Sequence, residues 1–531
     1  MNEIKVLDCT LRDGGYCNQW QFGRENILSI MNGLEAANAD IIECGYITNA
    51  ISAYDPNVTQ FRTFSQIEDI IAKTKINASY VAMMNYGEYT IDEIPENTNG
   101  LISGIRVAFR KKNLDASLEL CREIKNKGYN IFIQPMLSLG YTDSEFLSLI
   151  DKVNKLEPYS VYIVDSFGSM KSGDLLRLFY LADHNLKNDI TLGFHSHNNL
   201  QLAYSNAQSL ININSNRNMI LDSSIMGMGR GAGNLNSELI FQHINEKYGE
   251  KYKIVPLLNI IDQILSVFYK QNYWGYSLAN YLSATYNSHP NYATYLDNKD
   301  TLSFEGMNEI FSQMSDEKRF NYDKVYIETK YTEYMERDKE MCSNQDEFRS
   351  IIQGKNVFVI APGKSIDNFR EQITNLSASE NIVTISVNFV YPCIDTDFVF
   401  IGNRKRLKQL EAIKKPDDLK IIVASNVPVA KYFAKLSYAE LINDNHDVSD
   451  NSSLMLLKYL VNVGVKKIYI AGIDGYSYNS SDNYSKHQTN FIKSEKEIAA
   501  INKGLADIIN RLSEKTEIEF VTPSIVQNMI S

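Results

Sequence analysis

The first 250 residues contain eight short apolar runs, separated by longer amphipathic stretches such as 117–127 and 144–156. The runs are Ile4–Cys9, Ile41–Cys44, Tyr80–Met84, Gly104–Phe109, Ile131–Pro135, Val161–Val164, Ile190–His195 and Met219–Ile225. Short apolar runs are typical of buried strands, and the amphipathic stretches between them are typical of helices. Eight strand–helix units predict a (β/α)8 barrel, in which functional side chains lie at the C-terminal ends of the strands.

Length and charge limit the class of protein. With 531 residues the chain exceeds one ordinary core, so we expect two domains. A formal net charge of −11 argues against a general nucleic-acid-binding protein. The chain has no apolar run of 18 residues, so we expect no membrane span, and its start lacks the apolar region of a signal peptide. The six cysteines show no paired spacing, which favours a reduced, cytoplasmic protein without a Cys–metal site.

Polar side chains follow or end several of the predicted strands. They are Arg12, Asp13, Glu43, Arg106, Gln134, Asp165, His195 and His197. Because His195 and His197 are two residues apart in an extended segment, both face the same side. With Asp13 they offer three ligands to one divalent cation, and imidazole with carboxylate suits Mn, Fe, Co or Zn. Arg12 adds a fixed cation beside that metal, a combination suited to forming and holding an enolate.

A glycine-rich segment, Gly227-Met-Gly-Arg-Gly-Ala-Gly-Asn234, follows the eighth run. It does not open a βαβ unit, so it is not a dinucleotide-binding fingerprint. We expect its backbone to pass close to a bound anion or metal, with Asn234 as a further candidate ligand.

Taken together, Asp-x-Thr-x-Arg-Asp-Gly-Gly in the first unit, Glu43, His195-x-His197 and the glycine-rich segment resemble the DRE-TIM metallolyase superfamily. That group includes HMG-CoA lyase, isopropylmalate synthase and 4-hydroxy-2-oxovalerate aldolase, and the aldolase branch is the most similar. The resemblance covers about residues 1–300. It implies that Asp13, His195, His197 and Asn234 bind a divalent metal (Mn, Mg, Co or Zn). It also implies that Arg12 stabilises the enolate of a 2-oxo acid and that Glu43 orients Arg12 or a metal-bound water.

The acid/base residue departs from this pattern, because Tyr16 stands where the pyruvate aldolases have a His. A Tyr with its reference pKa near 10 is a poorer base than His unless the metal or Arg12 lowers that pKa. Tyr276, Tyr286 and His289 are further candidates beyond the barrel. The alternative for all of them is that they pack over the barrel, and for Glu43 and Gln134 that they are buried polar partners.

The chain divides on this basis into three parts. Residues 1–250 form the barrel, 251–353 a helical extension and connector, and 354–531 an open parallel α/β domain of Rossmann-like type. In the connector, the helical spacing of Ile310, Phe311 and Met314 predicts ordered helices. The strands expected in the last part are Val357–Ala361, Ile382–Val387, Asp397–Ile401, Lys420–Ala424, Lys467–Ala471 and Glu517–Val521.

The last part also resembles bacterial sialyltransferases that use CMP-activated sugars and the related motility-factor glycosyltransferases, over about residues 354–526. The shared motifs are Ala361-Pro-Gly-Lys-Ser365, Ile385-Ser-Val-Asn388, Asn451-Ser-Ser453, the run 467–474 and His487, although Pro362 replaces the usual Asn. The resemblance implies that Gly363, Ser365, Asn388, Ser452 and Asp474 line a nucleotide-sugar site. It makes His487 the general base, and the alternative is a histidine of a surface loop.

The sequence therefore predicts a bifunctional enzyme of surface polysaccharide biosynthesis. Its barrel would be a metal-dependent aldolase or lyase acting on a 2-oxo acid and an aldehyde, and its second domain would transfer a sugar from a CMP-type donor. The alternative is a single-activity aldolase with a non-catalytic nucleotide- or sugar-binding module. A scaffold without chemistry fits poorly with the Arg-Asp and His-x-His motifs. Because barrels of this group often pair, we also expect a homo-oligomer.

Overall fold

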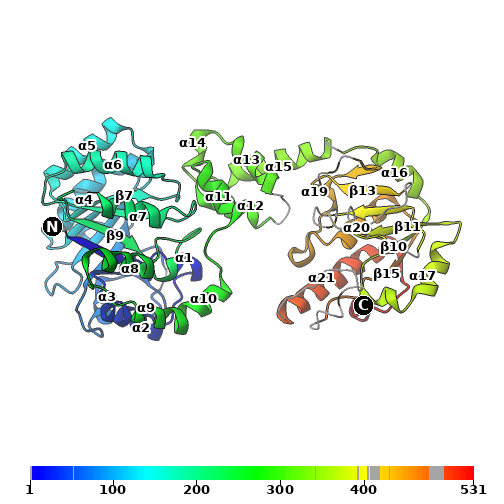
Figure 1. Cartoon of the computed structure of the whole chain (residues 1–531), viewed down its shortest axis with the longest axis horizontal. Helices are drawn as coiled ribbons and strands as arrows, with labels where there is room; N and C mark the ends of the chain where they lie inside the picture. Colours follow the sequence, from blue (N-terminus) through cyan, green and yellow to red (C-terminus); the bar gives the residue numbers. More distant parts are fainter. Residues whose placement is uncertain are drawn as a thin grey trace. The chain divides into compact units, whose positions relative to one another are not determined.

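The computed structural model describes residues 3–530, except 52, 214, 300, 301, 303, 341, 392, 393, 403–405, 407–418, 428, 430, 478–482 and 484–494. The chain forms two compact units (Figure 1). One comprises Met1–Thr294 with Met314–Tyr322, and the other Tyr295–Gln313 with Asp323–Ser531. Residues of the predicted connector thus contribute to both units.

The first unit contains a closed barrel of parallel strands. Its strands are β1 (Ile4–Asp8), β2 (Ile41–Ile47), β3 (Gln60–Phe61), β4 (Ser79–Asn85), β5 (Gly104–Phe109), β6 (Asn130–Pro135), β7 (Ser160–Asp165), β8 (Thr191–Ser196) and β9 (Met219–Ser223). The order is β1-β9-β8-β7-β6-β5-β4-β2-β3, and pairing of Leu7 with Ile41 joins β1 to β2 and closes the barrel. The short β3 is an addition at the edge of β2. The eight-stranded (β/α)8 barrel predicted from the sequence is confirmed.

Strand alternation separates an inner and an outer core. Val6 of β1 packs outward against the helices, whereas its neighbour Leu7 belongs to an interior cluster that includes Phe132 and Tyr162. The covering helices are α2 (Arg24–Ala36), α3 (Phe64–Ile71), α4 (Leu114–Asn126), α5 (Asp143–Leu156), α6 (Ser172–Asn185), α7 (Ala203–Asn212) and α8 (Ser237–Tyr248), preceded by the short α1 (Gly15–Asn18). Because side chains alternate along a strand, nearly continuous apolar runs supply both layers.

Helices continue the chain beyond the barrel. They are α9 (Val255–Ile260), α10 (Ser266–Gln271), α11 (Leu278–Thr285), α12 (Pro290–Asp297), α13 (Phe304–Ser312), α14 (Asp316–Arg319), α15 (Lys324–Glu340) and α16 (Gln345–Ile352). Ile310, Phe311 and Met314 are buried, as their helical spacing indicated. Among the helices described, none is both long and apolar enough to cross a membrane.

The second unit is built on a seven-stranded parallel sheet. Its elements are β10 (Asn356–Ile360), α17 (Arg370–Ser377), β11 (Ile382–Val387), β12 (Phe398–Ile401), β13 (Lys420–Ala424), β14 (Ala434–Leu436), α19 (Tyr438–Leu441), α20 (Ser452–Val463), β15 (Lys467–Ala471), α21 (Glu495–Ser513) and β16 (Glu517–Phe520). The strand order is β14-β13-β12-β11-β10-β15-β16. The six predicted strands are present, and β14 is an addition because three residues are too few to give a pattern.

Both faces of this sheet are covered. Val357 and Val359 of β10 pack in one cluster with residues of α16, α20 and α21, whereas Phe358 and Ile360 pack in another with Ile373 of α17. The order runs outward from β10 through β11 to β14 on one side and through β15 to β16 on the other. The order therefore reverses between β10 and β15, and in sheets of this kind ligands bind beside the carboxyl ends of the strands at such a reversal.

Candidate active site

Three buried side chains at the C-terminal end of the barrel form the candidate metal centre. Asp13 lies in the turn after β1, where its N–H donates to the Cys9 carbonyl at 2.8 Å. His195 is the penultimate residue of β8, and His197 directly follows the strand. Potential ligand atoms of Asp13, His195 and His197 all lie within 4.8 Å of one another. The structure thus brings together the three residues that the sequence predicted as ligands.

Hydrogen bonding orients the two imidazoles differently. His195 Nδ1 lies 3.0 Å from Asp222 Oδ2, so Nε2 is the nitrogen left for a metal. His197 Nδ1 lies 3.8 Å from Asp13 Oδ2 and is buried without a hydrogen-bond partner. Sequence reasoning missed Asp222 of β9, although it is the one acidic residue within the apolar run Met219–Ile225.

Asn234 lies against the same carboxylate. Its Nδ2 donates to Asp13 Oδ2 at 2.7 Å and to the Met228 carbonyl at 3.1 Å, while its Oδ1 is buried and has no hydrogen-bond partner. Rotation of the amide would present Oδ1 to a cation on Asp13. Two buried atoms that can accept a hydrogen bond lie near the Asp13 carboxylate, His197 Nδ1 and Asn234 Oδ1. Neither receives a hydrogen bond from a described residue. A divalent cation would satisfy both, so the residues fit a metal.

A continuous ion-pair network supports this centre. Arg12 donates from Nη1 to Asp13 Oδ1 at 2.5 Å and from Nε to Glu43 Oε2 at 2.8 Å. Arg106 Nη1 lies 2.9 Å from Glu43 Oε1, and Arg106 also pairs with Asp222. Two guanidiniums and three carboxylates leave one net negative charge. A divalent cation would turn this into one net positive charge, which suits an anionic substrate.

The network fixes the protonation of its members. Burial opposes ionisation of Asp13, but attraction to Arg12 and His197 outweighs it and holds the pKa of Asp13 well below its usual range. Burial also opposes ionisation of Asp222, whose pKa Arg106 and His195 nevertheless lower. Burial lowers the pKa of His197 to about 3 despite the neighbouring Asp13. Ionised Asp13 and neutral His197 are the forms that bind metals.

Aromatic side chains line the mouth beside Arg12. The Tyr16 hydroxyl lies 3.4 Å from that of Tyr46, and the Tyr16 ring packs edge-on against Trp20 with centroids 4.8 Å apart. The Arg12 guanidinium lies 5.9 Å from the Tyr46 ring centroid, and Tyr16 is 41% exposed. Tyr16 is therefore at the open end of the site, and Tyr46 contacts both Tyr16 and Arg12.

The other polar candidates have different positions. Asp165 is buried and accepts hydrogen bonds from the N–H groups of Ser169 and Met170, so it holds the loop after β7. Gln134 is buried, and its Nε2 has no hydrogen-bond partner. His289 packs against Phe167 of that loop with centroids 5.7 Å apart, whereas Tyr276 is 46% exposed. The His289 segment is thus close to the barrel mouth.

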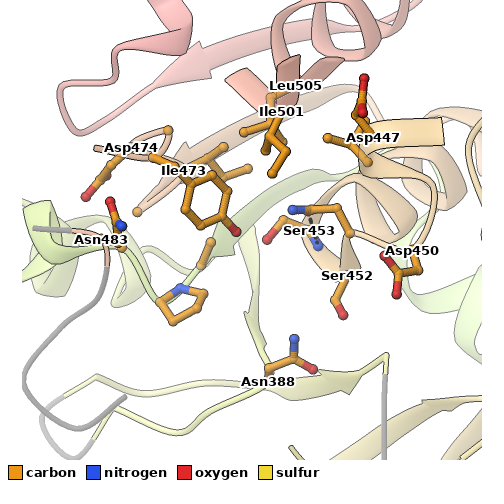
Figure 2. A pocket seen from close by; sticks show the side chains of 18 of the residues that line it. Asn388, Asp447, Asp450, Ser452, Ser453, Ile473, Asp474, Asn483, Ile501 and Leu505 are labelled. Atoms are coloured by element: carbon orange, nitrogen blue, oxygen red, sulfur yellow. Dashed lines mark hydrogen bonds between the residues drawn. The ribbon is translucent and has the colours of Figure 1, made fainter. Parts of the chain in front are cut away.

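The second unit has a cavity of about 330 Å³ at the C-terminal ends of β10 and β15. Four of the predicted nucleotide-site residues, Gly363, Asn388, Ser452 and Asp474, line it, and Ile473, Ile501 and Leu505 add an apolar side. In Figure 2, Asp474 and Asn483 lie at one end of the pocket and Asp447, Asp450 and Ser452 at the other. The cavity therefore occupies the point where the strand order reverses.

Ser365 and Asp474 are bonded to each other. Asp474 accepts from Ser365 N at 2.7 Å and from Ser365 Oγ at 2.5 Å, so the pair fixes the turn after β10. Asn451 caps α20 by accepting from the N–H groups of Ser453 and Leu454 at 3.1 and 3.2 Å. The predicted base His487 lies outside the described residues.

Comparison with known proteins agrees with the barrel. The family model HMGL-like matches residues 3–260. The chain is 28% identical over 241 residues to 4-hydroxy-2-oxovalerate aldolase of Geobacillus genomosp. 3, covering 45% of this chain and 69% of that protein. The aldolase of the same name from Thermomicrobium roseum is 31% identical over 242 residues, covering 44% and 65%. Oxaloacetate decarboxylase of Mycobacterium tuberculosis is 26% identical over 238 residues, covering 44% and 68%.

These matches span less than half of this chain and about two thirds of the relatives' own length. The matched residues 3–260 contain the eight-stranded barrel. Residues 3–260 thus match the HMGL-like family model, which supports a place for this N-terminal part in the DRE-TIM metallolyase superfamily.

Proposed function

We propose that the barrel is a metal-dependent aldolase that cleaves or forms a carbon–carbon bond next to a 2-oxo acid through an enolate. The observation that carries this proposal is the unused donor of Arg12. Its Nε and Nη1 bond to Glu43 and Asp13, whereas its Nη2 is buried beside the ligand cluster and has no hydrogen-bond partner in the described part of the chain. A buried guanidinium N–H left free in this way is a ready donor to an oxygen that becomes negative during reaction.

In the cleavage direction, a base takes the proton of the substrate's 4-hydroxyl group. The C3–C4 bond then breaks, an aldehyde leaves, and the electron pair forms an enolate whose C2 oxygen accepts from Arg12 Nη2. Protonation at C3 completes the 2-oxo acid. Asp13, His195, His197 and Asn234 would hold a divalent metal, which would supply Lewis-acid polarisation of the 2-oxo group.

Three side chains prepare this site before substrate arrives. Glu43 fixes the Arg12 fork from one side and Arg106 holds Glu43 from the other. Tyr16 is the proton carrier of the proposal, because its hydroxyl lies at the mouth next to that of Tyr46. Fixed donors need little reorganisation when charge develops, which is the main source of such catalysis.

Exchange of the pyruvate methyl protons for deuterium, followed by NMR, tests enolate formation without any aldehyde. We expect exchange with added Mn or Co, loss of exchange with EDTA, and at least a hundredfold reduction in Asp13→Asn and Arg12→Met. Asp183→Asn, which removes a carboxylate bonded to Arg217 instead, is the matched control. Metal-independent exchange, or full exchange in Asp13→Asn, would contradict the assignment.

We also propose that the second unit binds a CMP-type nucleotide sugar and transfers the sugar. The supporting observation is that four residues named from sequence motifs, Gly363, Asn388, Ser452 and Asp474, line one cavity where the strand order of the parallel sheet reverses. In the transfer, the bond from the anomeric carbon to the CMP phosphate breaks and one to an acceptor oxygen forms. The acceptor proton passes to a base, for which His487 stays the candidate.

Titration of the full-length protein with CMP and CDP, followed by calorimetry, tests this second proposal. Ser452→Ala and Asn388→Ala should each weaken nucleotide binding about tenfold, because one polar contact is lost. Ser350→Ala, on the exposed face of α16, is the control. Binding without turnover of any donor would favour the alternative of a non-catalytic module, and no binding would contradict a nucleotide site.

A further inference from the structure

Arg230 lies in the glycine-rich segment after β9 and is fixed next to the candidate metal centre. Its backbone N–H is 3.4 Å from Asp13 Oδ2. The preceding Gly229 leaves no room for a side chain, since a Cβ there would lie 2.2 Å from Asn234 Nδ2 and 2.7 Å from Asp13 Oδ2. The segment therefore passes tightly over Asp13 and Asn234, and the start of the Arg230 side chain is set by that packing.

The guanidinium of Arg230 lacks an acidic partner among the residues that the structure describes. Its Nη2 donates to the Ser166 carbonyl at 3.3 Å, and its central carbon lies 5.6 Å from the Tyr16 ring centroid. Its Nε is buried, and no residue that the structure describes forms a hydrogen bond with it. Arg12 and Arg106, in contrast, are each paired with two carboxylates. A partly buried guanidinium without an anion is costly, which suggests that a ligand supplies the anion.

Arg230 spans the mouth, with its backbone N–H near Asp13 and its guanidinium near Ser166 and Tyr16. After burial, which is the main cause, Arg230 contributes to the lowered pKa of His289 in the segment over the loop after β7. Arg110, at the end of β5, also lowers the pKa of His289 and bonds to the neutral Asn321 amide oxygen. In a chain of net charge −11, the mouth thus carries two guanidiniums that face no carboxylate in the described structure.

We propose that Arg230 binds an anionic group, a carboxylate or a phosphate, on the half of the substrate that leaves as the aldehyde. This inference rests on the proposed aldolase function. The 2-oxo acid half lies at Arg12 and the ligand cluster, whereas the Arg230 guanidinium packs on the exposed Tyr16 ring further out. The planar guanidinium fork matches both carboxylate and phosphate, and a charge-assisted contact of this kind discriminates strongly against a neutral analogue.

Matched acceptor pairs test this inference in aldol addition to pyruvate. Succinic semialdehyde and butanal differ in the terminal carboxylate, and glyceraldehyde 3-phosphate and glyceraldehyde differ in the phosphate. We expect the wild type to prefer at least one anionic acceptor in kcat/KM. Arg230→Met should lower that preference by about 10- to 100-fold, and Arg230→Lys should lower it less. Arg177→Met, which removes an exposed arginine of α6 paired with Asp143, should keep the ratio within about twofold.

The outcomes separate this inference from the proposed function. If Arg230→Met loses activity equally with charged and neutral acceptors and also exchanges pyruvate protons more slowly, Arg230 acts on the 2-oxo acid. If the ratio of kcat/KM for charged over neutral acceptors does not change, Arg230 is structural. Either result overturns the inference.

If the wild type shows no pyruvate exchange, the aldolase proposal fails by itself. Calorimetry with succinate and glycerol 3-phosphate on the Mn-treated full-length protein then decides. Binding at least tenfold weaker in Arg230→Met supports the anion site, and equal binding or none in the wild type rejects it.

Discussion

Asp222 is a residue whose role depends on two partners at once. It accepts from His195 Nδ1 at 3.0 Å and pairs with Arg106, which in turn holds Glu43 and through it Arg12. The candidate metal ligand His195 and the candidate enolate donor Arg12 are therefore positioned by one chain of buried charges. Removing one member leaves an unpaired buried charge, which typically costs 3–5 kcal/mol, so the isosteric amide is the informative replacement.

We expect Asp222→Asn to weaken metal binding by about 10- to 100-fold, because the amide no longer supports the basicity and orientation of His195. Titration with Mn²⁺ followed by electron paramagnetic resonance measures the affinity without requiring activity. Asp183→Asn again serves as the control, since Asp183 bonds to Arg217. Equal Mn²⁺ affinity in the wild type and Asp222→Asn would show that Asp222 does not tune the metal.

At the scale of elements, the loop after β7 depends on a buried carboxylate. Burial raises the pKa of Asp165 to about 7, although backbone N–H groups of the loop, among them those of Ser169 and Met170, oppose the shift. The unfolded value is near 3.9, so between pH 4 and pH 7 the folded state binds more protons than the unfolded state. The contribution of Asp165 to the free energy of unfolding is therefore fully present below pH 4 and is lost as the pH rises towards 7.

We expect the free energy of unfolding of the wild type, relative to Asp165→Asn, to fall by roughly 2–4 kcal/mol between pH 4 and pH 7. Asp8, Asp13 and Asp222 titrate in both proteins and cancel in the difference. Urea unfolding followed by tryptophan fluorescence, with EDTA present, reports the first unit, since Trp20 and Trp274 are the two tryptophans of the chain. A difference that is constant with pH would show that Asp165 keeps an ordinary pKa.

The turns after β10 and β15 cross closely in the second unit. A Cβ on Gly363 would lie 2.3 Å from the Gly472 carbonyl oxygen and 2.6 Å from Asp474 Oδ2, so the sheet excludes a side chain there. We expect Gly363→Ala to destabilise this unit by about 1–3 kcal/mol. Hydrogen exchange of peptides from β10 and β15 measures the loss. Gly173→Ala on α6 meets no atom within 4 Å and should be neutral or slightly stabilising, and equal behaviour of the two variants would contradict the crossing.

At the scale of the whole molecule, each compact unit has its own hydrophobic core and its own candidate ligand site. Metal binding should therefore stabilise the first unit selectively. At a free concentration one hundred times the dissociation constant, Mn²⁺ should add about 2.7 kcal/mol to the fluorescence-detected transition. The unfolding transition of the second unit, followed by far-ultraviolet circular dichroism, should not shift when Mn²⁺ is added. EDTA should reverse the effect, and an equal shift in Asp13→Asn would contradict the ligand assignment.

The sequence could predict the site residues that lie at the ends of strands, and it could not predict the others. Asp13, His195 and His197 were predictable because strand order and the two-residue period fix where their side chains meet. Asp222 escaped notice because one acid in an apolar run has no pattern, and its value lies in contacts with Arg106 and His195 from other strands. No sequence pattern marks Arg230 as a site residue either, because only the fold shows that it lacks an acidic partner in the described structure. Asp165 was grouped with the site, but its carboxylate holds a loop instead.

The sequence by itself determined the eight-stranded barrel, the parallel sheet after residue 354 and the identity of the candidate metal ligands. These follow from periodicity and spacing, which are local properties of the chain. The tertiary structure alone decided the ion-pair network that links His195 to Arg12, the unused donors of Arg12 and Arg230, and the cavity at the C-terminal ends of β10 and β15. The reason is physical: burial and charge pairing depend on distances between residues that lie from 27 to 116 positions apart in the network, and only the folded chain sets those distances.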